Sequence, residues 1–187
     1  PLLAGDDTNE PTSGSGIIPA GDDGQPLNLN FETGDLKDWT ATGEAFAQQP
    51  IRGKIDPKRP FGADKNSFHT GECWIGGFEK LFDPPQGTLT SVPFKVTQPW
   101  ASMLVGGGAL PETRVELLNE NGKPFFQIRG TNTEELSPVI IDLRDRKDKK
   151  IAIRIVDKSS DGWGHVNFDD FRFHEKKPTF KRPELLP

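Results

Sequence analysis

The residues best suited to chemistry lie in one stretch near the end of the chain, residues 159–173. Asp161, Gly162 and Gly164 surround Trp163 and predict a turn, because Asp bonds to nearby backbone and Gly adopts positive φ. A protruding turn exposes the ring of Trp163, which could stack on the apolar face of a sugar. The alternative is a ring folded over the end of the protein.

The turn leads into a predicted strand with an irregular pattern. Its apolar residues are spaced by two, three and two positions: Val166, Phe168, Phe171 and Phe173. This spacing predicts a β-bulge at Asp169 and Asp170, which would re-aim one carboxylate. The acidic pair is therefore either part of a site or a staple at a sheet edge.

Four further residues are candidate ligand contacts. His165 is expected to be a structural histidine, and it could also donate a hydrogen bond beside Trp163. Asn167 and Arg114 lie on polar positions of predicted strands and would bind only if those faces form the site. Trp74 is a weaker candidate, because its strand pattern favours the core.

The sequence does not predict an enzyme. His69, His165 and His174 are far apart, and neither a Gly-x-Ser-x-Gly nor a His-Glu-x-x-His motif occurs. The apolar neighbours of Cys73 should keep its thiol protonated. Carboxylate pairs for glycoside hydrolysis could be drawn from several acidic residues, but sequence does not set their separation.

The elements that must position these residues are short strands separated by turn residues. Asn119 to Gly122 between two apolar runs predicts a hairpin of 113–118 and 124–129. Other predicted strands are 27–31, 40–48, 72–79, 87–96, 100–108, 139–143, 151–156 and 165–173. Residues 49–71 predict a long polar loop with basic side chains that could contact an anion. Without an amphipathic helix, this pattern predicts an all-β, two-sheet antiparallel β-sandwich of jelly-roll type.

Composition limits the partners. A net charge of −5 over 187 residues argues against nucleic-acid binding, and no apolar run is long enough to span a membrane. A single cysteine excludes an internal disulfide framework. We expect residues 1–26 to be a linker, residues 27–174 the sandwich, and residues 175–187 a basic, proline-rich tail.

Several motifs resemble a known group of modules, with a similarity that covers residues 27–174. They are residues 30–36 with Trp39, and residues 87–91, 104–108 and 162–171. Together they resemble a module of large secreted planctomycete proteins that also carry c-type cytochrome domains. They are also similar to the accessory sandwich of levanase-like enzymes of glycoside hydrolase family 32. The chain departs from this pattern at Glu72-Cys73, where an aromatic pair is expected, and it has no Cys-x-x-Cys-His haem motif.

The resemblance implies a galactose-binding-like jelly roll, export to an extracellular or periplasmic location, and a non-catalytic role. We therefore expect a carbohydrate-binding-like module that tethers a larger exported protein, with its neighbouring domains, to polysaccharide. The alternative is a structural, adhesion or protein-docking domain without a small ligand.

The resemblance also implies a structural Ca²⁺ site. Glu32 would meet Asp169 or Asp170 if the first and last strands lie side by side, as in the modules that the chain resembles. The alternative is that the two aspartates accept backbone hydrogen bonds at the bulge and that Glu32 points to solvent.

Overall fold

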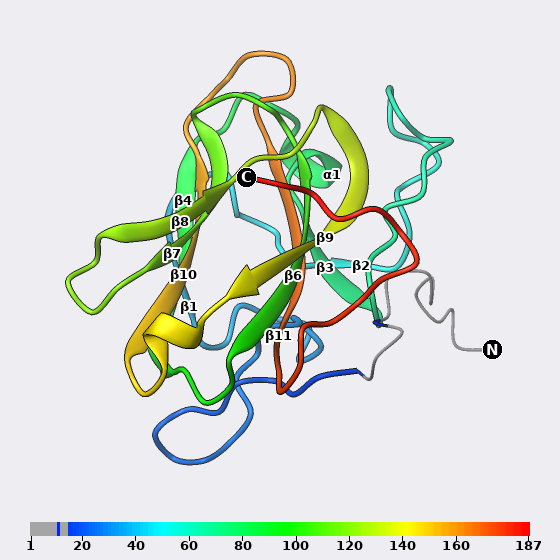
Figure 1. The fold of residues 1–187 in the computed structure, drawn as a ribbon. Helices are drawn as coiled ribbons and strands as arrows, with labels where there is room; N and C mark the ends of the chain where they lie inside the picture. The colour runs from blue at the N-terminus through cyan, green and yellow to red at the C-terminus, as the bar shows by residue number, and fades with distance from the viewer. Residues whose placement is uncertain (1–10, 12–14) are drawn as a thin grey trace.

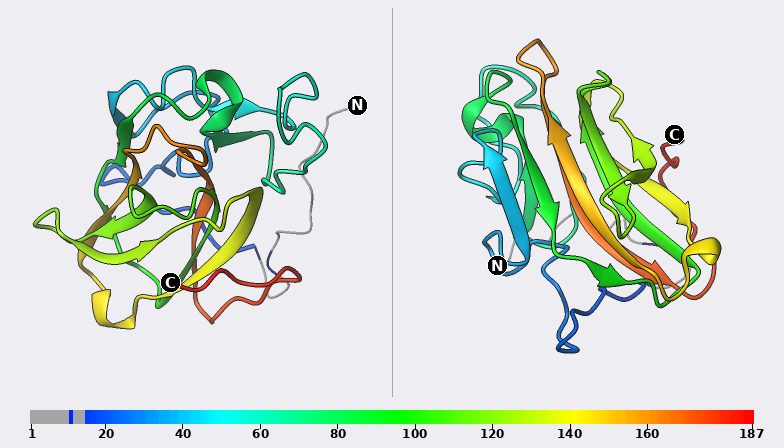
Figure 2. Two further views of the ribbon diagram at one scale, coloured as in Figure 1. Left: turned by 90° about the horizontal axis from the view of Figure 1, so that it is seen from above. Right: turned by 90° about the vertical axis from the view of Figure 1, so that its left-hand side faces the viewer.

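The protein folds into two antiparallel β-sheets that face each other in a computed structural model, which describes residue 11 and residues 15–187 (Figures 1 and 2). The first sheet has the order β1 (Trp39–Gly43), β4 (Gly87–Ser91), β10 (Lys150–Asp157), β7 (Thr113–Leu118) and β8 (Pro124–Ile128), with β5 (Phe94–Lys95) also paired to β10. The second has the order β2 (Ile51–Arg52), β3 (Cys73–Gly76), β11 (Val166–His174), β6 (Trp100–Gly107) and β9 (Thr133–Asp142). The predicted all-β, two-sheet antiparallel sandwich is confirmed.

In the part of the chain that the structure describes, two short helical turns accompany the strands, α1 (Phe78–Leu81) and the 3-10 turn η2 (Arg144–Arg146). Neither is part of a sheet. Within the described residues, no helix has the length and apolar character needed to cross a membrane.

The core fills the space between the sheets. Phe31 stacks on Trp39 with ring centroids 5.1 Å apart, and Phe168 meets each of them edge-on at 6.0 Å. Such edge-to-face pairs stabilise a core beyond the area that they bury. Phe168 therefore connects the last strand to the segment that precedes β1.

Local turn chemistry and the bulge agree with the sequence. Val115 pairs with Ile128 in the hairpin of β7 and β8, and the N–H of Asn119 bonds to the carbonyl of Lys123 across its turn. The register of β11 against β6 shifts between Asp169 and Arg172, which confirms the bulge at the acidic pair.

The first predicted strand, at 27–31, is wrong. Its residues form turns and irregular backbone, although Leu27, Leu29 and Phe31 are buried as the alternation indicated. The cause is Asn28, whose side chain donates to the carbonyls of Asp35 (2.9 Å) and Lys37 (3.3 Å). These local bonds compete with pairing to a neighbouring strand.

The segments on either side of the predicted domain contact the sandwich where the structure describes them. Ile17 forms an antiparallel bridge with Phe173 of β11. Near the other end, the N–H of Leu185 bonds to the carbonyl of Pro138 in β9. Residues 1–10 and 12–14 of the predicted linker lie outside the described residues.

Asn28 gives a stability prediction. Asn28→Ala should lower the free energy of unfolding by about 1–3 kcal/mol, because it removes both hydrogen bonds that the buried Asn28 side chain donates to the backbone of the following turn. Denaturant unfolding measures this change. Asn30→Ala is the matched control, since the Asn30 side chain accepts only one long hydrogen bond, at 3.5 Å. Equal losses in the two variants would contradict this role of Asn28.

Candidate ligand-binding pocket

A pocket of about 600 Å³ lies at one end of the sandwich, where four separate stretches of chain meet. These are the loop after β2, the segment from α1 to Asp83, and the turns that precede β9 and β11 (Figure 1). The lining residues are Arg59, Phe61, Gly62, Lys65, Phe78, Asp83, Asn132, Thr133, Glu134, Gly162, Trp163 and His165.

Trp163 stands half-buried at the edge of this pocket. The predicted turn is present, closed by a 2.7 Å bond from the N–H of Gly164 to the carbonyl of Asp161. Gly164 is required there, because a Cβ atom would lie 2.6 Å from the carbonyl oxygens of Asp161 and Ser159. The turn holds Trp163 at φ +67°, with its ring 5.5 Å from that of His165.

His165 forms part of the buried floor, with 2% of its surface exposed. Its Nδ1 bonds to Oδ1 of Asp83 at 2.6 Å, and its Nε2 lies 3.6 Å from Oε2 of Glu134. Burial lowers the pKa of His165, but Asp83 and Glu134 outweigh burial and raise that pKa to about 9. The imidazole is therefore a cation at neutral pH.

Arg59 carries the second buried cation of the floor. Its guanidinium donates to both Glu79 and Glu134, and it lies 4.4 Å from the centre of the Phe78 ring. Burial raises the pKa of Glu134, but His165 and Arg59 outweigh this effect and lower it to about 2. Burial raises the pKa of Glu79, despite the opposing hydrogen bond from the Asp56 backbone and the charge of Arg59.

Asn167 supports the pocket from behind. It is fully buried, and its Nδ2 donates to Oε2 of Glu134 at 3.1 Å. Its Oδ1 accepts a 3.1 Å bond from the N–H of Gly77, just before α1. Asn167 thus positions a pocket carboxylate and does not line the pocket itself.

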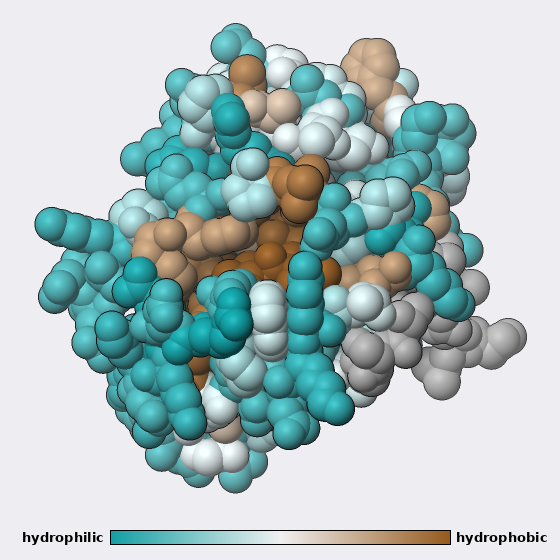
Figure 3. Space-filling view, viewed as in Figure 1, coloured by the Kyte–Doolittle hydropathy of each residue, from teal (hydrophilic) through white to brown (hydrophobic). Residues whose placement is uncertain are grey.

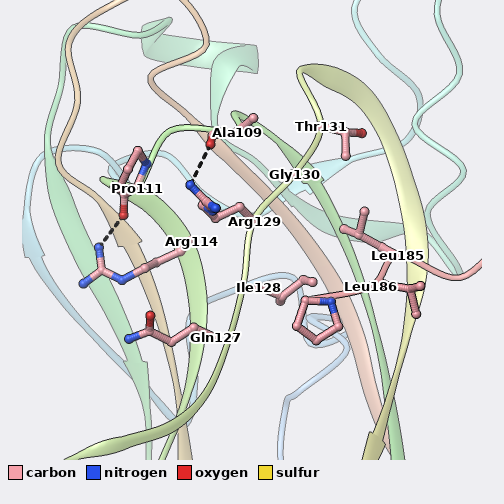
Figure 4. A pocket seen from close by; sticks show the side chains of 11 residues that line it. Ala109, Pro111, Arg114, Gln127, Ile128, Arg129, Gly130, Thr131, Leu185 and Leu186 are labelled. Atoms are coloured by element: carbon pink, nitrogen blue, oxygen red, sulfur yellow. Dashed lines mark hydrogen bonds between the residues drawn. The ribbon is translucent and has the colours of Figure 1, made fainter.

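Two other predicted contacts lie elsewhere. Trp74 is fully buried, donates to the carbonyl of Gly53 and stacks on His69, so a ligand at the surface does not reach it. Its hydrophobic strand pattern already favoured the core. Arg114 lines a different pocket of about 550 Å³ and donates to Glu116 and to the carbonyl of Pro111 (Figure 4). That pocket combines arginine side chains with apolar ones, and the face drawn in Figure 3 shows apolar residues in a hollow edged by hydrophilic ones.

Sequence reasoning missed most of the charged floor. Arg59, Asp83 and Glu134 come from three distant stretches, and none belongs to a recognisable motif. The one available signal was the length of the polar loop at 49–71, because long loops in compact domains are often functional. That loop supplies Arg59 and Phe61.

Two of the acidic residues predicted to bind calcium, Asp169 of β11 and Glu32 before β1, contact a separate loop, residues 70–73. Asp169 Oδ2 accepts from the N–H (2.9 Å) and hydroxyl (3.2 Å) of Thr70. Glu32 Oε1 accepts from the N–H groups of Glu72 (2.9 Å) and Cys73 (2.8 Å). Two carboxylates therefore hold one short loop.

In that arrangement, the surroundings of Asp169 disfavour its ionised form. Asp169 is fully buried, and its Oδ1 has no hydrogen-bond partner among residue 11 and residues 15–187. Burial, followed by the charge of Asp170, raises its pKa. Asp170 is paired instead with Arg172 at 2.7 Å. Among the described residues, no three His, Cys, Asp or Glu side chains gather as a metal site. Any cation here would also need backbone carbonyl ligands.

The chain is similar to one part of a much longer known protein. No protein-family model matches the sequence. The chain is 33% identical over 150 residues to ecdE of Aspergillus rugulosus, which is described as a candidate glycosyl hydrolase. This similarity covers 75% of the chain and 19% of ecdE, so the chain spans about a fifth of that relative's length.

Solved structures with related folds include a carbohydrate-binding module and an adhesin domain. TmCBM61, in complex with β-1,4-galactotriose, is 16% identical over 78% of this chain and 93% of that one, with a TM-score of 0.47. The K2 cleaved adhesin domain of Lys-gingipain is 14% identical over 78% and 96%, with a TM-score of 0.48. Neither similarity bears on how the pocket works. The predicted links to planctomycete proteins and to glycoside hydrolase family 32 stay predictions.

The floor geometry predicts the titration of His165. Its folded pKa of about 9 should fall in Asp83→Asn, because the variant removes the anion bonded to Nδ1 while Glu134 and the more distant Asp157 remain. Imidazole NMR signals followed from pH 6 to 10 measure this. His69, which is also buried, is the internal control, and a His165 pKa unchanged by the substitution would contradict the assignment.

The raised pKa of His165 also predicts how the stability of the protein depends on pH. A folded pKa above the unfolded value of about 6.5 stabilises the protein fully below pH ~6.5, and this contribution is lost as pH rises towards 9. His165→Gln should therefore cost more stability at pH 6 than at pH 9.5, as measured by denaturant unfolding. A cost independent of pH would contradict a charged His165.

Proposed function

We propose that this domain is a non-catalytic carbohydrate-binding module whose site is the pocket beside Trp163. The observation that carries the proposal is the combination of a half-exposed indole at the edge with fixed polar groups on the buried floor. Aromatic rings stack on the apolar faces of sugars, and charged side chains bond to hydroxyl groups. His165, Asp83 and Glu134 are close enough to Trp163 to serve one ligand.

The floor is suited to binding because its groups are already oriented. His165 is held by Asp83, and Glu134 is held by Arg59 and Asn167. Side chains that are fixed before the ligand arrives lose little further conformational entropy on binding. A ligand would then meet donors and acceptors in preset positions.

The low pKa of Glu134 excludes this residue as the general acid of a hydrolase. A glycosidase needs one carboxylic acid with a raised pKa to protonate the leaving group. Glu134 has a pKa of about 2 and stays ionised. Its charge is balanced by Arg59 and His165, which supports a role in holding hydroxyl groups.

A modular role agrees with the partial relative. The chain resembles about a fifth of ecdE, a much longer protein described as a candidate glycosyl hydrolase. Small binding domains joined to larger chains raise the effective concentration of their partners at a surface. We infer that this domain tethers a larger exported protein and its neighbouring domains to a polysaccharide.

We also propose that Ca²⁺ binds at the loop of residues 70–73. The support is the buried, unpartnered Oδ1 of Asp169 and the nearby carboxylate of Glu32, whose charge also raises the pKa of Asp169. Calcium prefers carboxylate and carbonyl oxygens and would relieve their repulsion. Asp170 would not be a calcium ligand in this proposal. Its carboxylate pairs with Arg172 in the bulge.

Trp163 provides the test of sugar binding. In affinity gels containing neutral or anionic polysaccharides, the wild type should be retarded by at least one, and Trp163→Ala should not be. The thermal midpoint of the variant should change little, because the ring is partly exposed. Trp100→Ala is a matched control, since Trp100 is also partly buried but lies outside the pocket.

Three outcomes would oppose this proposal. If no polysaccharide retards the wild type, the domain is better described as an adhesion or protein-docking module. If Trp163→Ala lowers the thermal midpoint by many degrees, the ring belongs to the packed interior. Turnover of a glycan by the wild type would instead indicate an enzyme.

Calcium binding has its own test, a thermal melt in EDTA and in millimolar calcium. Calcium at about a hundredfold excess over its Kd should stabilise the wild type by about 2.7 kcal/mol. Asp169→Asn keeps the shape of the side chain but should lose this response. Asp142→Asn is the control, because Asp142 is an exposed partner of Arg144 away from this loop. A wild-type midpoint insensitive to calcium, in protein free of metal, would exclude the site.

A further inference from the structure

Phe61 is an exposed aromatic residue at the same pocket as Trp163. It lies in the loop after β2, and 72% of its surface is open to solvent. Single exposed apolar residues are common and need no explanation. An exposed ring that lines a pocket with a second aromatic side chain is a different case, because both rings face the same ligand space.

The position of Phe61 is set by buried contacts. Nε of Arg59 donates to the carbonyl of Phe61 at 2.5 Å, while the rest of the guanidinium pairs with Glu79 and Glu134. The same loop is fixed again where the N–H of Asp56 donates to Glu79 at 3.1 Å. The ring is exposed, but the backbone that carries it is tied to the interior.

The pocket floor runs from the ring of Trp163 to the backbone of Phe61. His165 is 5.5 Å from Trp163 and 5.2 Å from Phe78, and Phe78 is 4.4 Å from the Arg59 guanidinium. Nε of Arg59 in turn donates to the backbone carbonyl of Phe61. His165, Phe78 and Arg59 are all buried, so they form a continuous floor with an aromatic residue at each end.

Gly62 keeps the Phe61 end of the floor open. Its φ is +67°, and a Cβ atom there would lie 3.4 Å from Arg59 Nη2 and 3.5 Å from Glu134 Cγ. The absence of a side chain leaves space over these charged groups. A ligand group beside Phe61 can therefore approach the floor.

We propose that Phe61 forms a second sugar-binding subsite, so that the pocket binds an oligosaccharide with one ring on Trp163 and another on Phe61. This inference rests on the proposed carbohydrate-binding function and specifies it. Three floor side chains link Trp163 to the backbone of Phe61, an arrangement that suits successive sugars of one chain better than a single sugar clamped between two faces. The ligand class is thus a glycan of at least two residues.

The test compares ligands of increasing length by isothermal titration calorimetry. The probes are β-1,4-linked galactose, glucose and xylose oligomers and fructose oligomers, each from the monosaccharide to the tetrasaccharide. For the series that the wild type binds, affinity should rise with length. Phe61→Ala should weaken binding of the longer oligomers about two- to tenfold, the range expected for one aromatic contact, and should leave the monosaccharide unaffected.

Two further variants serve as controls. Phe61→Tyr keeps an aromatic face and should retain the length dependence. Phe125→Ala removes a partly buried ring on β8 that pairs with Arg146 and lies outside the pocket, so it should leave the affinities unchanged. The thermal midpoint of Phe61→Ala should equal that of the wild type, because the ring is exposed.

The outcomes separate the subsite from the function on which it rests. Wild-type binding that Phe61→Ala leaves unchanged at every length overturns the subsite alone. Equal weakening of monosaccharide and tetrasaccharide also overturns it, because Phe61 would then act on the same sugar as Trp163. Failure of the wild type to bind any probe overturns both the subsite and the proposed function.

Discussion

The buried guanidinium of Arg59 is the interaction on which the candidate site depends. It joins Glu79 of α1 to Glu134 of β9, and it holds the loop that carries Phe61. Burying one cation with two carboxylates is costly unless each is paired, and removing one partner of such a group typically costs about 3–5 kcal/mol. Here the second cation is His165, beside Glu134. The charged groups of the floor therefore depend on one another, because removing any one of them leaves another buried charge without its partner.

This linkage explains how loops from distant parts of the chain can present a defined pocket. The end of β6 joins two of the lining segments, because the N–H of Asn132 bonds to the carbonyl of Gly107 and the N–H of Gly108 bonds to the carbonyl of His165. Asn167 adds the connection to the sheet, because it lies in β11 and bonds to both Glu134 and the backbone of Gly77. The side chain of a regular strand thus anchors the neighbouring segments by hydrogen bonds. Loops held on a fixed scaffold commonly form binding sites in this way.

The sequence predicted the features that depend on residues close together in the chain and missed those that depend on distant residues. The turn at Trp163, the hairpin of β7 and β8, and the bulge at Asp169 depend on neighbouring residues, so local patterns were sufficient. The segment at 27–31 failed because alternation predicts which side chains are buried but does not reveal that Asn28 bonds locally. The charged floor was not predictable, because its members are distant in sequence and each reads alone as a surface residue.

Binding and stability are divided between different residues of the same pocket. Trp163 and Phe61 supply ring surface at the edge, and neither fills the hydrophobic core between the sheets. Arg59 and His165 are buried, so a change there alters both the ligand contacts and the charge balance of the fold. Exposed edge residues can consequently change without loss of folding, whereas the floor constrains every sequence that keeps this pocket. The proposed sugar binding therefore places the determinants of preference in the two loops that carry Trp163 and Phe61, because substitutions there leave the buried charges paired.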